Sequence, residues 1–382
     1  MPRQTGSYKQ STTLGESVEA FVPFDLPPEN PALDPSAFSD LNQAAELAIA
    51  RLSGVSGLVP SIDWLLYSAL RKEALLTSQI EGTQATLTDL FDDEAGFTVT
   101  NIADVEEVSN YLRAFRLVQS NLRNQDGLPI SVRLLCDAHR LLLDGARGRS
   151  KQPGELRRSQ NWIGGTRPSN AVFVPPPPDD VAKLLNGLEK FIHDVNQKLP
   201  PLVRIALVHA QFETIHPFLD GNGRIGRLLI AALLEEWSLL SEPIMYLSGY
   251  LKENQSEYYR LLSGIRTNGD WESWIIFFLE GVASAAANAE KSIIEIASLV
   301  TNHRKLLLES TKATPLAYRL FELLPMMPRF TIDRVRKELN TTFPTATAAV
   351  TILEDLGILC ELTGNKKNRH YSYQSYVDLL SR

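Results

Sequence analysis

Helical periodicity through residues 61–309 is the sequence feature that most constrains the fold. Ser61 can cap a helix in which apolar residues recur at three- and four-residue spacings as far as Ile80, before Glu81-Gly82 ends it. The same spacing predicts further helices at residues 103–123, 129–144, 178–198, 201–216, 224–239, 254–265 and 270–309. Strand-like sequence is scarce before residue 320, so the main body is predicted to be an all-α bundle.

One short β segment is predicted inside this bundle, at residues 161–174. Trp162-Ile163 and Val172-Phe173-Val174 flank a Gly-Gly turn, which predicts a hairpin. The four consecutive prolines that follow, Pro175–Pro178, cannot continue a strand ladder and favour an extended conformation. We therefore expect a hairpin that leaves through a proline-rich exit.

Residues 314–382 have a different pattern from the bundle. Helical windows at 315–324, 331–339 and 344–356 precede two β-like pieces at 358–362 and 370–373. Three helices and a two-stranded wing form the winged variant of the helix-turn-helix, in which the third helix fills a DNA groove and the wing meets phosphates. The basic residues Lys366, Lys367 and Arg369 lie between the two β pieces, but residues 344–356 carry no basic stripe. The sequence therefore leaves DNA binding and a purely structural use, in packing or dimerisation, equally open.

Composition excludes several classes of protein. The chain has 382 residues, of which 44% are hydrophobic and 22% charged, as in ordinary globular proteins, and its length predicts two or three domains. No apolar stretch is long enough to predict a membrane span, and no secretory signal is expected from the N-terminal sequence. Cys136 and Cys360 are too few for a disulfide framework or a cysteine zinc site, so a cytoplasmic location is expected.

Charge is distributed unevenly along the chain. The whole sequence has 38 basic and 45 acidic residues, a net charge of −7, which argues against nucleic-acid binding over the whole surface. Residues 312–382 hold ten basic and seven acidic residues, so this segment has a net charge of +3 and the remainder −10. Such a difference indicates different partners for the two parts.

The most informative run is HPFLDGNGRIGR, residues 216–227, which lies between two apolar helical windows. A glycine-rich loop before a helix suits an anion, because the free N–H groups of the first helical turn point at the ligand with the positive end of the helix dipole. Arg224 and Arg227 are three residues apart, so they share a face and can both bind phosphate oxygens. Asp220 could hold Mg²⁺ together with substrate phosphates, and His216 is a base whose ordinary pKa lies near neutral pH.

The other residues of this run support the same interpretation. Gly221, Gly223 and Gly226 would let the backbone approach a ligand closely, and Asn222 adds an amide donor at the centre of the loop. Each piece alone is most often structural, since Asn-Gly is a common turn and a single histidine or arginine pair is common in any protein. Their combination within twelve residues at a helix start indicates a functional site.

The run 216–227 resembles the signature of the Fic-domain family, HPFxDGNGRxxR, at every defined position. Gln160–Gly165 with Pro175–Pro178 is similar to the family's flap hairpin and its proline-rich exit. Tyr258-Tyr259 and Gly269–Glu272 resemble elements that follow the family's core. The arm before the bundle and the winged C-terminus resemble bacterial multidomain members, so the resemblance covers about residues 20–380.

The resemblance implies transfer of AMP from ATP to a Tyr, Thr or Ser hydroxyl of a target protein, with release of pyrophosphate. His216 would deprotonate the hydroxyl, and Asp220 would hold Mg²⁺, with Mn²⁺ as an alternative. Asn222 and the loop N–H groups would stabilise charge on the α-phosphate, while Arg224 and Arg227 would bind the β- and γ-phosphates. The residues implied to contact ATP are Glu81, Ile163, Gly164, Gly165, Thr166, Asp220, Gly221, Asn222, Gly223, Arg224, Ile225, Gly226, Arg227 and Tyr258.

Two of these implied contacts concern segments outside the signature. The flap, Ile163–Thr166, would pair with the backbone of the target as an added strand. Tyr258 would lie at the adenosine, although an ordinary structural tyrosine of an amphipathic helix is an equally good interpretation of this residue.

An inhibitory element is predicted at the end of the first long helix. Thr77 and Glu81 are four residues apart and share one helix face, and a glutamate in the last turn favours a nearby cation because it opposes the helix dipole. Thr77-x-x-x-Glu81-Gly82 also resembles the family's inhibitory motif, (S/T)xxxE(G/N). The resemblance implies that Glu81 pairs with Arg227 and keeps that arginine from the γ-phosphate.

These observations divide the chain into four segments. The first forty residues are polar and rich in proline, which predicts an extended arm that wraps a domain or is partly disordered. The expected division is an N-terminal arm at 1–60, an inhibitory helix region at 61–100, a Fic catalytic core at 101–311 and a winged-helix domain at 312–382.

Three other functions stay open from the sequence. The core could sense nucleotide within a DNA-binding regulator, although sensing would not need His216. Glu81 could instead position a water that removes AMP from a modified protein. Phosphoryl or phosphocholine transfer is the third alternative, and Gly221-Asn222-Gly223 favours nucleotidyl transfer over the reaction of the related Doc kinases. The sequence names neither the target protein nor the modified residue, and it leaves self-modification and a homodimer open.

Overall fold

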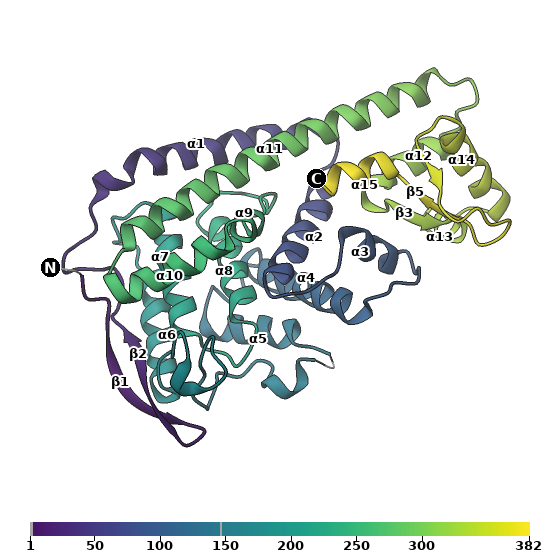
Figure 1. The fold of residues 1–382 in the computed structure, drawn as a ribbon. Coiled ribbons are helices and arrows are strands. Elements are labelled where there is room, and N and C mark those ends of the chain that lie inside the picture. The colour runs from purple at the N-terminus through teal and green to yellow at the C-terminus, as the bar shows by residue number, and fades with distance from the viewer. Residues whose placement is uncertain (1–2, 146) are drawn as a thin grey trace.

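Helix α7 (Pro201–Ile215) lies inside the helical bundle, because apolar residues cover almost all of its surface rather than one stripe. Twelve of its fifteen residues are buried in the computed structural model, which describes residues 3–145 and 147–382. Helix α8 (Asn222–Glu236) follows after a short loop, and α11 (Trp271–Glu309) also packs on α7 (Figure 1). The fully buried Trp274 of α11 donates its indole N–H to the carbonyl of Ala206 at 2.8 Å, which joins the two helices.

The other helices of the bundle pack around α7, α8 and α11. They are α2 (Ile62–Ile80), α4 (Ile102–Leu122), α5 (Val132–Leu142), α6 (Pro178–Ile192), α9 (Ser248–Glu253) and α10 (Gln255–Asn268). All of them except α9 lie in windows predicted from apolar spacing, so the predicted helical fold class is confirmed. No helix in the described part of the chain is both long and apolar enough to cross a membrane.

The N-terminal region differs from the predicted extended arm. Strands β1 (Gly6–Thr13) and β2 (Glu16–Pro23) pair antiparallel along their whole length. The turn between them places Leu14 and Gly15 at φ values of 50° and 79°. Helix α1 (Ser39–Val55), which the apolar spacing did not reveal, then lies along α11 (Figure 1). This region therefore forms a hairpin and a helix that pack on the bundle.

The segment predicted as a flap hairpin contains less regular β structure than expected. Ile163 and Phe173 form an isolated β-bridge rather than a strand ladder, with the Ile163 N–H donating to the Phe173 carbonyl at 2.8 Å. The turn between them contains the 3₁₀ helix η4 (Pro168–Asn170), and the Asn170 side-chain oxygen accepts the Thr166 N–H at 2.9 Å. A side chain thus closes the turn in place of a ladder, because the connection is too long for a tight hairpin.

The C-terminal segment contains the three predicted helices and both predicted strands. The helices are α12 (Pro315–Leu323), α13 (Ile332–Glu338) and α14 (Phe343–Asp355), and the strands are β4 (Cys360–Glu361) and β5 (His370–Ser372). Two further elements, β3 (Arg329–Thr331) and α15 (Gln374–Leu380), were not predicted. The three strands form an antiparallel sheet in the order β3-β5-β4. A winged helix-turn-helix remains our interpretation of this element order.

The C-terminal segment contacts the bundle through helix α3 (Leu87–Glu94) and the residues after it, through α2, which packs against η5 (Leu324–Met326), and through α11, which packs against α15. Arg329 donates to both carboxylate oxygens of Asp92, at 2.6 and 2.7 Å. Phe97 stacks on His370 with the ring centroids 3.5 Å apart. The remaining short 3₁₀ helices are η1 (Pro35–Ala37), η2 (Ser56–Leu58) and η3 (Arg149–Lys151).

Replacing Trp274 with alanine should destabilise the protein by about 3–5 kcal/mol, because it leaves a large cavity between α7 and α11. Urea unfolding followed by far-ultraviolet circular dichroism measures this loss. The control is Val195→Ala at a site that is 91% exposed, where a change within about 0.5 kcal/mol is expected. A Trp274→Ala loss as small as that of the control would contradict the central position given to this side chain.

Candidate active site

The loop between α7 and α8 is held in one conformation by residues of the run 216–227. His216 ends α7 in the left-handed region, at φ 50°, and its N–H donates to the Phe212 carbonyl. Gly221 begins α8 at φ 77°. Between these points, the His139 ring lies 3.0 Å from the Asp220 carbonyl and stacks on Phe218 with the ring centroids 3.8 Å apart. The loop is therefore supported from α5 as well as by its own residues.

Asn222 closes the loop from inside. Its side-chain oxygen accepts the Phe218 N–H and its amide donates to the Phe218 carbonyl, both at 2.8 Å. The residue is buried, so its amide is occupied by the backbone and is not aimed at either cavity of the site. The structure thus corrects the expectation of a free amide donor: Asn222 fixes the loop shape that presents the first N–H groups of α8.

Gly223 and Gly226 lie in the first turns of α8 and leave room there for neighbouring side chains of the site. A Cβ at Gly226 would lie 2.5 Å from Oε1 of Glu213, because α7 and α8 approach closely there. A Cβ at Gly223 would lie 2.3 Å from Oε1 of Glu81 and 2.9 Å from Nη1 of Arg227. Gly223 therefore makes the space in which Glu81 reaches Arg227.

His216 is prepared as a neutral base. Burial lowers the pKa of its imidazole to about 4, and the positive charge of Arg157 acts in the same direction. The Arg157 guanidinium is 2% exposed and donates to the carbonyls of His216 and Pro176, at 2.8 and 2.5 Å. Arg157 thus fixes the backbone that carries the histidine, a role that its sequence neighbourhood does not reveal.

Arg227 is buried and bound to the end of α2. Its Nε–H donates to the Thr77 hydroxyl at 2.6 Å, and Nη2 donates to Oε1 of Glu81 at 2.5 Å. Burial alone would raise the pKa of Glu81, but the Arg227 guanidinium holds it below its ordinary value, so the carboxylate is charged. Oε1 of Glu73 accepts the Ser248 hydroxyl, and the backbone N–H of Ser248 donates to Oε2 at 3.1 Å, which anchors α2 one turn earlier.

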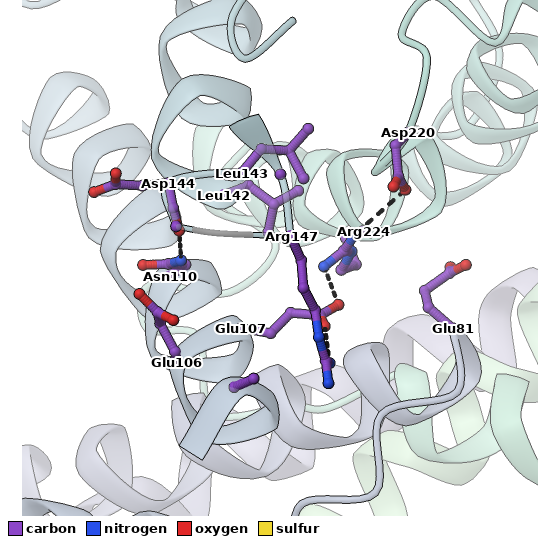
Figure 2. Close-up of a pocket in the computed structure, with 13 residues that line it drawn as sticks. Glu81, Glu106, Glu107, Asn110, Leu142, Leu143, Asp144, Arg147, Asp220 and Arg224 are labelled. Carbon is purple, nitrogen blue, oxygen red and sulfur yellow. Dashed lines mark hydrogen bonds and ion pairs between the residues drawn. The ribbon is translucent and has the colours of Figure 1, made fainter. Parts of the chain in front are cut away.

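Arg224 is bound by carboxylates from two sides, as Figure 2 shows. Its Nη1 donates to Oε1 of Glu107 on α4, and its Nη2 lies 3.6 Å from Oδ1 of Asp220. The side chain is 6% exposed, and its Nε–H is buried without a hydrogen-bond partner among the described residues. Glu107 could not be predicted from sequence patterns, because its partner Arg224 is more than a hundred residues away along the chain.

Two cavities meet at Glu81. The first, of about 260 Å³, is lined by Glu81, Glu107, Asp220 and Arg224 among others (Figure 2). The second, of about 380 Å³, is lined by Glu81, His216, Gly223 and Arg227. The Glu81 side chain therefore forms part of the wall of both cavities.

The predicted flap residues divide between this site and the surface. Ile163 and Gly164 line the larger cavity, whereas Gly165 and Thr166 lie in the exposed turn that Asn170 closes. Ile225, predicted beside the phosphates, is fully buried in the core. The burial of Ile225 follows from helical geometry, since neighbouring residues of one helical turn point in different directions.

The far wall of the larger cavity contains residues from α7 and α10. Tyr258 lines it but is 1% exposed, and its hydroxyl lies 2.9 Å from Nε2 of His209, so the ring is a fixed part of the wall. Tyr259, Arg266 and Glu213 also line this cavity, and the sequence reasoning missed Arg266 and Glu213. In the sequence, the pair Tyr258-Tyr259 was the feature that could have indicated that α10 lines the cavity.

Asp220 suits a magnesium ion that is shared with a ligand. Its side chain is 45% exposed at the mouth of the smaller cavity, and Oδ1 accepts the Gly221 N–H at 2.6 Å. Within residues 3–145 and 147–382, no group of three or more His, Cys, Asp or Glu side chains is arranged to hold a metal ion. One carboxylate completed by phosphates and water is the usual arrangement for Mg²⁺, and Asp220 fits it.

Comparison with known proteins gives the following similarities. Residues 39–119 match the model described as "Fic/DOC family N-terminal", and residues 129–234 match the model described as "Fic/DOC family". The chain is 28% identical over 208 residues to the protein adenylyltransferase Fic of Drosophila willistoni, covering 53% of this chain and 38% of that protein. It is 32% identical over 157 residues to that of Drosophila grimshawi, covering 40% and 29%. The chain thus spans less than two fifths of the length of these relatives.

Solved structures share the fold. A Fic family protein from Desulfovibrio desulfuricans G20 matches with a TM-score of 0.57 at 21% identity, covering 90% of this chain and 97% of that chain. Fic-1 (residues 134–508) from C. elegans matches with a TM-score of 0.52 at 22% identity, covering 69% and 75%. At these identities the likeness concerns the arrangement of helices.

Glu213 should make the stability of the protein depend on pH. Burial raises the pKa of its carboxyl to about 7, against an ordinary value of 4.5, so the folded protein holds a proton that the unfolded chain releases between these pH values. Relative to Glu213→Gln, which stays neutral, the wild type should lose about 1–3 kcal/mol of unfolding free energy as pH rises from about 4.5 to about 7. Urea unfolding of both proteins across pH 4–8 measures this. A constant difference between them would show that folding does not shift the pKa of Glu213.

Proposed function

We propose that this chain, a Fic-domain protein, transfers AMP from ATP to a hydroxyl group of a target protein and releases pyrophosphate. The observation that carries the proposal is the division of chemical groups between two adjoining cavities. His216 and Arg227 line one of them, and Asp220 and Arg224 line the other. A base, two guanidinium groups and a carboxylate at a helix start are the groups that transfer of a nucleotide requires.

In the proposed reaction, the target hydroxyl attacks the α-phosphorus of ATP. The oxygen–phosphorus bond forms as the bond from the α-phosphorus to the bridging oxygen breaks, and pyrophosphate leaves with the bonding electrons. His216 takes the hydroxyl proton. Burial lowers the pKa of its imidazole to about 4, so the ring is neutral at pH 7 and has a free nitrogen for the proton.

The two arginines orient the phosphates for this attack. Arg227 would bind the γ-phosphate and Arg224 the β-phosphate, which places the α-phosphate at the start of α8. The backbone N–H groups there, shaped by the Asn222 contacts with Phe218, would stabilise the charge that grows on the α-phosphate. Such preorganised donors need no rearrangement as the reaction proceeds.

Asp220 would hold Mg²⁺ beside these phosphates, and Mn²⁺ is the alternative. When bound, the ion would neutralise part of the charge of the α- and β-phosphates. The half-exposed Asp220 carboxylate supports this assignment, because it is available at the cavity mouth where the phosphates would enter.

Glu81 restrains this activity in our proposal. It occupies Arg227, so that the guanidinium cannot bind the γ-phosphate, and it lines both of the cavities that an extended triphosphate would have to connect. The Glu73 contacts with Ser248 support the restraint, since they keep the end of α2 in place.

The target protein would dock on the flap. Ile163 lines the cavity that contains His216, while Val172 on the opposite side of the bridge is 78% exposed. A backbone added at this edge would place a side-chain hydroxyl near His216 with little dependence on target sequence. The same geometry makes a residue of another copy of this chain a suitable substrate, so self-modification is expected.

Glu81→Gly should raise AMP incorporation at least about tenfold, because it frees a charged donor for the γ-phosphate. Incorporation is measured from ATP labelled in the α-phosphate, with self-modification as the readout. Glu253→Gly, which changes an exposed glutamate at the last position of α9, is the matched control and should leave incorporation unchanged. Equal activity of Glu81→Gly and wild type would overturn the restraint.

His216→Ala should lower transfer by about 10²–10⁴-fold in the Glu81→Gly background, because no base remains for the hydroxyl proton. Intact-mass spectrometry after incubation with ATP reports both the loss and the group transferred, and His303→Ala in α11 is the control. Added masses of phosphate rather than AMP, or full activity without His216, would refute the proposed reaction. Nucleotide binding without any added mass would favour the sensing alternative.

A further inference from the structure

The contacts of Glu107 suggest a function that the proposed reaction does not include. Glu107 lies on α4, in the wall of the smaller cavity, and its two carboxylate oxygens face two different arginines (Figure 2). Oε1 accepts Nη1 of Arg224, and Oε2 lies 3.9 Å from Nη1 of Arg147. One carboxylate is thus shared between a buried arginine of the signature and an arginine at the protein surface, which is 65% exposed.

The Arg224 side chain is not fully satisfied in this position. Its Nε–H is buried and has no acceptor among the described residues, whereas Nε and Nη2 of Arg227 both have partners. A buried donor without a partner destabilises the arrangement that contains it. Arg224 is therefore held by Glu107 in a position that leaves one of its donors free for a further acceptor.

From these contacts we propose that Glu107 is a positioning residue that competes with the β-phosphate of the nucleotide for Arg224 and moves its ion pair to Arg147 when the nucleotide binds. The inference rests on the proposed function, since it assumes that Arg224 meets a β-phosphate. No covalent bond is made or broken in the exchange. Arg224 exchanges its ion pair with the Glu107 carboxylate for one with a phosphate oxygen, and Glu107 moves closer to Arg147.

Arg147 makes this exchange possible without an unpaired carboxylate. The Glu107 side chain is 21% exposed, so the loss of its partner would leave a partly buried carboxylate unpaired, which is unfavourable. Arg147 already lies beside Glu107 and is held there by Asp104, whose Oδ1 accepts its Nη1 at 2.6 Å. Asp104 is fixed in turn by the Gln84 N–H at 2.9 Å, so the second partner of Glu107 is in place before any nucleotide binds.

The two phosphate-binding arginines are thus held by separate helices. Glu81 at the end of α2 binds Arg227, and Glu107 on α4 binds Arg224. Because α2 and α4 pack on one another, both restraints belong to the same side of the site. The Glu107 restraint is expected to weaken the binding of any nucleotide with a β-phosphate, whether or not Glu81 has moved.

The test is isothermal titration calorimetry of ADP and AMP with the full-length chain. ADP has a β-phosphate but no γ-phosphate, so it reports on Arg224 without requiring release of Arg227, and AMP has neither. Glu107→Gln should bind ADP about tenfold more tightly than wild type, since the charged competitor is removed and the side-chain shape is kept. AMP affinity should stay unchanged.

The adjacent Glu106→Gln is the matched control. Glu106 is exposed, lines the same cavity and forms no ion pair or hydrogen bond among the described residues, so its change should leave ADP affinity unaltered. Equal gains in Glu106→Gln and Glu107→Gln would mean that general negative charge, not the Arg224 contact, weakens ADP binding, and would overturn the inference.

Arg147→Ala tests the second half of the exchange, and its comparison of ADP with AMP leaves Glu107 itself unchanged. With only Arg224 left as a partner, Glu107 should hold it more firmly, so ADP affinity should fall by about threefold while AMP affinity does not. The fall should disappear in the double variant Glu107→Gln, Arg147→Ala. A fall that persists in the double variant, or appears equally for AMP, would show a long-range charge effect and overturn the inference.

The predicted changes in ADP affinity do not depend on whether the chain transfers AMP. ADP binding requires no chemical step, so a protein without any added mass in the transfer assay could still show the predicted ADP response. Unchanged or weaker ADP binding by Glu107→Gln would overturn the role of Glu107 while leaving the transfer reaction untouched.

Discussion

Arg227 is a positive charge buried between α2, α7 and α8, and the rest of the site depends on how that charge is neutralised. A guanidinium in this position needs a carboxylate or another anion within contact distance, because an unpaired buried charge is strongly unfavourable. In the structure described here, the anion is Glu81, and Gly223 provides the space for it. The requirement that makes Arg227 a suitable phosphate ligand therefore also makes it a suitable partner for the end of α2.

The loop before α8 must be held in one conformation before an anion binds. Its N–H groups are useful to an anion only if they are held in place before the anion arrives. Asn222 and His139 satisfy this condition by bonding the loop backbone from inside and from α5. Arg157 does the same for the end of α7. The site thus separates into side chains that face a ligand and polar side chains that hold the backbone, and both kinds occur within the same short run.

The sequence was sufficient to predict the helical bundle and the position of the site, because both depend on local patterns. Apolar spacing located α7 and α8, and the run 216–227 brought together groups that lie within a few residues. The roles of Asn222 and Ile225 were not predictable in the same way, since the direction of a side chain in a tight turn depends on the closed loop. Glu107, Glu213 and Arg266 were missed because their importance comes from contacts between distant segments. The pairing of β1 with β2 was missed because β1 has no buried residue and therefore no apolar alternation.

Helix α2 has neighbours at both ends, and this has a consequence for how the chain can be divided. Its first half packs near Leu380 of α15 and against η5, and its last turn is followed directly by Glu81. A shortened chain without the C-terminal segment would expose apolar side chains of α2 to water and remove part of the support of that helix. Such a truncated protein would be a poor reference for the activity of the bundle alone. For the same reason, natural sequences that differ in the C-terminal segment would also differ in the contacts that hold α2 and therefore Glu81 in place.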